Sequence, residues 1–148
     1  MPYEIKRKPQ LKDTLTLTDE DKNVKVVIDV DLDLNNISKD FRKKYVGFLD
    51  AQKAAYAANE AEDKKDVLLA YDEYGKSIYG LMCVVFGEES SKTILDFFEN
   101  DLTELSSQIL PFIQSVVYPA FQRAAAERTR QMRQYYRGRR KKHVKWMP

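Results

Sequence analysis

The fold is decided by residues 78–121, which read IYGLMCVVFGEESSKTILDFFENDLTELSSQILPFIQSVVYPAF. Large apolar residues are denser here than anywhere else in the chain, and the polar residues 87–91 interrupt them once. Burial of one such side chain contributes roughly 1.5–3 kcal/mol to folding. We therefore expect this stretch to form the core or a groove that binds a partner.

Apolar residues at spacings of three and four extend from this stretch in both directions, which is the pattern of amphipathic helices. Upstream, the pattern predicts a helix over residues 38–59, with Ser38 as its N-cap. A second helix follows and ends at Gly87, and the short connection predicts that the two helices pack antiparallel. A short third helix, capped by Ser90 or Ser91, should run to residue 98.

The chain after residue 100 predicts one long helix with interruptions. Asp101 and Glu104 are spaced as in a capping box, which starts a helix. Pro111 and Pro119 each remove a backbone hydrogen bond, so we expect kinks or a break at these positions. A final helix should run over residues 120–138.

The region before the helices predicts a β-hairpin over residues 13–34. Residues 14–18 alternate polar and apolar, and residues 19–23 supply a turn. In residues 24–34 every second position is apolar, which places six side chains on one strand face: Val24, Val26, Ile28, Val30, Leu32 and Leu34. The fold class is therefore mainly α with an N-terminal β-hairpin (α+β), built as a small bundle of four to five helices with a long kinked C-terminal helix.

The chain divides into one globular domain and two appendages. Residues 1–12 contain two prolines and predict a flexible arm. The globular domain covers residues 13–122, with its helices within 38–122. Residues 123–148 form a basic C-terminal helix and tail, of which residues 139–146 are expected to be disordered.

Charge is strongly separated along the sequence. From Arg123 onward there are ten Lys or Arg and one acid, a net charge of +9, whereas the 122 residues before it carry a net charge of −7. On the final helix Phe121, Ala125, Met132 and Tyr136 share one side at about 100° per residue. The basic residues of the opposite stripe and of the tail are Arg123, Arg130, Arg133, Arg137, Arg139, Arg140, Lys141 and Lys142. This asymmetry predicts an acidic partner for the tail, or association of the tail with an acidic body.

The residues needed for catalysis or metal binding are not grouped in this sequence. The single His143 lies in the basic tail, far along the chain from the single Cys83, which we expect to be a buried small apolar residue. The triplet Asp29, Asp31 and Asp33 is spaced as in a calcium loop, but Leu34 stands where that loop needs Gly. Strand alternation explains these aspartates without a metal. We predict no catalytic, cofactor-binding or metal-binding residue and no enzyme activity.

Nothing in the sequence predicts membrane insertion. The longest apolar run, residues 81–86, is far shorter than the roughly 20 residues that span a bilayer. The N-terminus is charged and broken by Pro2 and Pro9, which is unlike a signal peptide. We expect a soluble, intracellular protein.

Three segments resemble the tail assembly chaperones of long-tailed, siphovirus-type bacteriophages: YGLMCVVFGEE (79–89), ILDFFEN (94–100) and ILPFI (109–113), with Pro119 downstream. The resemblance covers about residues 14–122 and consists of apolar positions and a helix stop. It implies a non-enzymatic protein that binds the tape measure protein and recruits tail tube subunits. It also implies self-association, a place in the cytoplasm of the infected bacterial host, and absence from the mature virion.

A chaperone of this kind needs an exposed apolar surface able to take amphipathic helices. On this resemblance, the candidates for binding the client are Phe97, Phe98, Ile109, Phe112, Ile113, Val116 and Phe121. For each of them, burial in the core is the alternative.

Two other functions stay open from the sequence. The basic C-terminal helix, with Tyr135, Tyr136 and Trp146 among its cations, predicts nucleic-acid binding through phosphate neutralisation and base stacking. Small size and mixed architecture also fit a structural phage component, such as a head–tail connector or tail completion protein.

Overall fold

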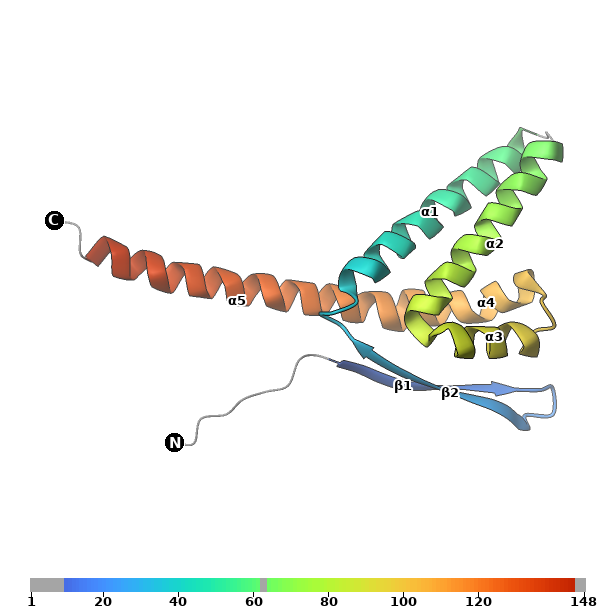
Figure 1. The fold of residues 1–148 in the computed structure, drawn as a ribbon, viewed down its shortest axis with the longest axis horizontal. Coiled ribbons are helices and arrows are strands. Elements are labelled where there is room, and N and C mark those ends of the chain that lie inside the picture. Colours follow the sequence, from blue (N-terminus) through green and yellow to red (C-terminus); the bar gives the residue numbers. More distant parts are fainter. Residues whose placement is uncertain (1–9, 62–63, 146–148) are drawn as a thin grey trace.

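The computed structural model describes residues 10–61 and 64–145, and the side chains of residues 24, 64 and 138–145 lie outside this description. Figure 1 shows a helical hairpin, a long helical rod and a β-hairpin that meet at one end of the rod. The elements in chain order are β1 (Gln10–Thr18), β2 (Val24–Asp33), α1 (Ser38–Glu60), α2 (Lys64–Phe86), α3 (Glu88–Phe97), α4 (Leu102–Phe112), the π-helix η1 (Ile113–Val117) and α5 (Tyr118–Lys145).

The β-hairpin has the predicted alternation. β1 and β2 pair antiparallel, with Leu15 opposite Ile28 and a register shift next to Thr18. Ile28, Val30, Leu32 and Leu34 are buried, whereas Asp29 and Asp31 are exposed on the other face. β1 begins at Gln10, so residues 10–12 belong to the hairpin and not to the predicted arm, while residues 1–9 lie outside the described residues.

α1 and α2 form the predicted antiparallel pair, but α1 starts differently. Ser38 is already helical, and its hydroxyl donates to the carbonyl of Asn35 at 3.2 Å. The carboxylate of Asp33 stabilises the turn before α1 by accepting hydrogen bonds from the backbone N–H groups of Asn35 and Asn36, both at 3.1 Å. The prediction of a Ser38 N-cap is therefore wrong, because the turn at Asp33 already brings the chain into the helix.

Gly87 ends α2 and starts α3. Its N–H donates to the carbonyl of Cys83 at 3.0 Å, and its own carbonyl accepts from the N–H of Ser91 at 3.0 Å. The predicted helix stop at Gly87 is confirmed, whereas the predicted Ser90 or Ser91 cap is wrong. α3 begins with Glu88 directly after Gly87, and its two acidic first-turn residues suit the positive end of the helix dipole.

α4, η1 and α5 form one uninterrupted rod from Leu102 to Lys145 (Figure 1). Asp101 caps it as predicted, since its side chain accepts from the N–H of Glu104 at 3.2 Å. The two prolines do not break it. Instead the backbone widens into a π-helix just before Pro119, where the N–H of Tyr118 donates to the carbonyl of Ile113, five residues back. Widening of this kind relieves the clash between a proline ring and the preceding turn.

α5 also continues beyond the predicted end at residue 138, and its last residue is Lys145. The expected disorder of residues 139–146 stays a prediction, and residue 146 lies outside the described residues. The cationic side chains predicted at Arg139, Arg140, Lys141 and Lys142 lie outside the described side chains.

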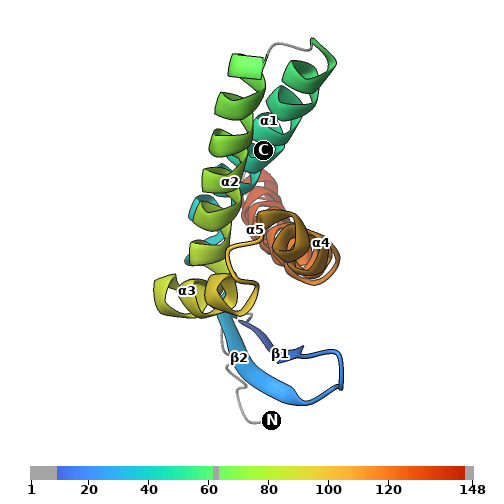
Figure 2. The ribbon, with the colours of Figure 1, turned by 90° about the vertical axis from the view of Figure 1, so that its right-hand side faces the viewer.

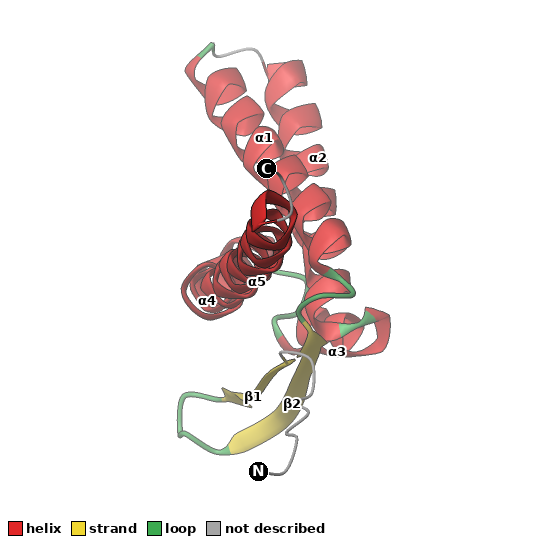
Figure 3. Cartoon of the chain, turned by 90° about the vertical axis from the view of Figure 1, so that its left-hand side faces the viewer, coloured by secondary structure: helices red, strands yellow, loops and turns green. Residues whose placement is uncertain are grey.

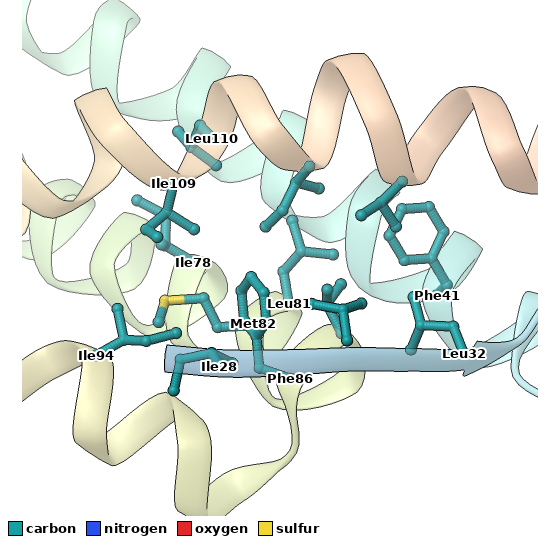
Figure 4. Packing of buried hydrophobic residues seen from close by; sticks show 14 of the residues in the cluster. Ile28, Leu32, Phe41, Ile78, Leu81, Met82, Phe86, Ile94, Ile109 and Leu110 are labelled. Carbon is teal, nitrogen blue, oxygen red and sulfur yellow. The ribbon is translucent and has the colours of Figure 1, made fainter. Parts of the chain in front are cut away.

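The core lies where the three parts meet. Figure 4 shows Ile78, Leu81, Met82 and Phe86 of α2 between β2 and the rod. α1 packs on the rod through stacked rings, with centroid distances of 4.3 Å for Phe41–Phe121 and 4.6 Å for Tyr45–Tyr118. Figures 2 and 3 show the α1–α2 hairpin on one side of the rod and the β-hairpin on the other.

Candidate protein-interaction surfaces

The seven predicted partner-binding residues do not form one surface. Four of them are buried in the core, namely Phe98, Ile109, Ile113 and Phe121. Phe97, Phe112 and Val116 are half-buried, and the Phe112 ring stacks on Phe86 at 6.1 Å. Ile113 and Phe121 are buried and expose no surface to a partner. Phe97, Phe98 and Ile109 come together at the edge of a groove.

That groove lies between β1 and the α3–α4 corner and has a volume of about 630 Å³. We call it the hairpin groove, and its apolar lining comes from Leu15, Leu17, Phe97, Phe98 and Ile109. Its acidic lining residues are Asp19, Glu20, Glu99 and Glu104. Lys25 lies 3.9 Å from a carboxylate oxygen of Asp19 and partly balances that charge. The hairpin groove therefore combines an apolar lining with negative charge.

A second groove runs along α2 against the start of α4, with a volume of about 570 Å³. We call it the α2 groove, and its partly exposed apolar side chains are Tyr71, Tyr79, Leu95 and Leu102. Its charged residues, Asp72 and Lys76, pair with each other at 3.2 Å. Sequence reasoning missed this groove, although the spacing of Leu68, Tyr71, Gly75 and Tyr79 along one face of α2 was available as a signal.

Gly75 lets α4 approach α2 in the α2 groove. A Cβ atom at this position would lie 2.8 Å from the Leu102 Cδ2 atom, closer than van der Waals contact allows. Leu102 consequently packs directly against the helix backbone and forms one wall of the groove.

The third surface is the outer part of α5. A hydrogen bond from Arg128 Nη1 to Asn35 Oδ1 at 2.6 Å ties α5 to the body. Beyond it Met132 and Tyr136 are 57% and 63% exposed, and Arg133 and Arg137 are also exposed. α5 thus presents the two predicted faces, one apolar and one cationic, to the surroundings of the molecule.

Two half-buried tyrosines have shifted pKa values. The pKa of Tyr74 is raised chiefly by burial, and the pKa of Tyr45 is raised for the same reason. Cys83 is half-buried and not buried as predicted, and it lies beside Tyr79, whose pKa is also raised. In the described part of the chain no three His, Cys, Asp or Glu side chains are grouped closely enough to hold a metal ion.

Comparison with protein-family models, curated proteins and solved structures gives no match for this chain. Within residues 10–61 and 64–145, every helix is too short or too polar to cross a membrane.

Proposed function

We propose that this chain is a non-enzymatic assembly chaperone for a bacteriophage tail, which binds the tape measure protein and recruits tail tube subunits to it. The proposal places it in the cytoplasm of the infected host and outside the finished virion. Its first support is the resemblance of residues 14–122 to such chaperones. Its second support is the α2 groove.

The α2 groove has the properties that an amphipathic client helix needs. Tyr is enriched at protein interfaces, and Tyr71 and Tyr79 belong to this groove. One turn before Tyr71, Leu68 is 73% exposed and extends the apolar face toward the tip of the α1–α2 hairpin. A helix with apolar residues at i, i+3, i+4 and i+7 would bury this face.

Co-expression with a fragment of the tape measure protein tests the proposal. The wild-type chain should keep the fragment soluble, and Tyr71→Asp should abolish this effect because a carboxylate would then occupy the groove. Leu69→Asp is the matched control, since Leu69 is also exposed but lies about 200° around the helix from Tyr71. Circular dichroism would check that both variants fold. A fragment that stays insoluble with the wild-type chain would contradict the proposal.

Nucleic-acid binding is the second candidate, favoured by the exposed Arg123, Arg133 and Arg137 of α5. Binding of DNA and RNA should then weaken steeply with salt, and Arg133→Gln with Arg137→Gln should reduce the salt dependence. If the chain is instead a head–tail connector or tail completion protein, mass spectrometry should detect it in purified virions.

A further inference from the structure

The apolar face of α5 continues from the core into the surroundings without a change of helix. Phe121 and Ala124 are buried against the body, and Met132 lies three turns after Phe121 on the same side of the helix. Met132 and Tyr136 are nevertheless mostly exposed. An isolated helix of this length is marginal in water, so a partner that covers these side chains would stabilise the outer part of α5.

The covering surface has to belong to another molecule. α5 continues the rod away from the body, and Figure 1 shows its C-terminal end on the opposite side from the turn between β1 and β2. The hairpin groove includes Asp19 and Glu20 of this turn and Glu99 of the α3–α4 corner. As long as the rod is straight, α5 cannot reach the hairpin groove of its own chain.

The two surfaces are chemically complementary. The hairpin groove presents the half-buried Leu15 and Phe97 together with the exposed Glu20, Glu99 and Glu104. The outer part of α5 carries Met132 and Tyr136 on one side, and the exposed Arg133 and Arg137 lie about 100° further around the helix. Apolar burial between oppositely charged surfaces gives both affinity and a defined orientation.

We propose that copies of this chain associate head to tail, with the outer part of α5 of one copy docked in the hairpin groove of the next. The contact joins two different surfaces, so a pair of copies keeps one free groove and one free helix, and the assembly grows into an open filament or closes into a ring. This inference goes beyond the proposed chaperone function and needs no client.

Sedimentation of the full chain at increasing concentration tests the proposal. The average mass should rise above the monomer mass of 17.3 kDa at low salt and fall again at high salt. A groove variant, Glu20→Lys with Glu99→Lys, and a helix variant, Arg133→Gln with Arg137→Gln, should each be monomeric. The control Asp50→Lys with Glu60→Lys makes the same charge change on exposed residues of α1 and should assemble normally.

Mixing the two defective variants gives the decisive measurement. The intact α5 of the groove variant should dock in the intact groove of the helix variant, which yields a 1:1 complex that grows no further. Association through two α5 helices would give no such complex, because every mixed pair would then include one defective helix, and the groove variant would already assemble by itself. That result would overturn the proposal. A monomeric wild-type chain that binds DNA or RNA at low salt would also overturn it and would assign α5 to nucleic acid.

Discussion

Gly87 has φ +86° and ψ 160°, a backbone conformation that is open almost only to glycine. Gly87→Ala should therefore lower the free energy of unfolding by about 1–3 kcal/mol, even though nothing lies within 4 Å of the added methyl group. Gly47→Ala is the control, since Gly47 lies within α1 with equally open space and the substitution should stabilise by roughly 0.5–1 kcal/mol. Urea unfolding measures both, and equal effects would contradict the argument.

Ser91 is fully buried in α3, and its hydroxyl has no hydrogen-bond partner among the described residues. A buried polar group without a partner costs about 1–3 kcal/mol. Ser91→Ala should therefore raise the free energy of unfolding. The net gain should be about 1 kcal/mol, because the packing contacts of the oxygen atom are lost at the same time. Ser90→Ala serves as the control at a partly exposed position of the same helix and should change stability less. A destabilised Ser91→Ala variant would mean that the hydroxyl is bonded in solution.

At the scale of single elements, the start of the rod depends on one carboxylate. Asp101→Ala removes the acceptor for the N–H of Glu104 and should destabilise the protein by about 0.5–2 kcal/mol. Asp101→Asn keeps an acceptor oxygen and should retain most of the stability. Thermal unfolding of the two variants distinguishes them, and identical melting temperatures would show that the cap contributes nothing.

Glu127 and Arg130 form an ion pair on α5 near the point where the helix leaves the body. The pKa of Glu127 is lowered, chiefly because Arg130 donates hydrogen bonds to its carboxylate at 2.6 and 3.1 Å. Because the pKa is lowered in the folded state, the ion pair stabilises the helix at pH values above the usual pKa of 4.5. This stabilisation is lost as the pH falls through the lowered pKa.

An NMR titration of the Glu127 carboxyl group should therefore give a midpoint below 4.5. Arg130→Gln should raise that midpoint, whereas Arg133→Gln should leave it unchanged. A normal midpoint in the wild-type chain would mean that the pair does not form in solution.

At the scale of the whole molecule, the rod sets the shape. Residues 102–145 span about 65 Å at 1.5 Å per residue. A compact chain of 148 residues has a radius of gyration of about 15 Å. Small-angle X-ray scattering at low concentration and high salt should give a clearly larger value. A value near 15 Å would mean that α5 folds back on the body, and it would remove the geometric basis for head-to-tail association.

Local signals were sufficient to predict most elements of the fold. The alternation in residues 24–34, the stop at Gly87 and the Asp101 cap depend on neighbouring residues, so the sequence by itself determined a β-hairpin followed by helices. The same local logic failed at Pro119, because a π-helix just before the proline accommodates its ring and the chain continues as one rod. It failed at Ser91 because burial of the hydroxyl depends on how α3 is oriented on the core.

Only the tertiary structure decided which apolar side chains are covered. The sequence assigned Ile113, Phe121 and Met132 to similar amphipathic helices, yet the first two are buried and the third is exposed. The difference arises because the body ends near Arg128, whereas α5 continues to Lys145. The extent of a contact depends on where the neighbouring elements end in space, and no local pattern of residues encodes that position.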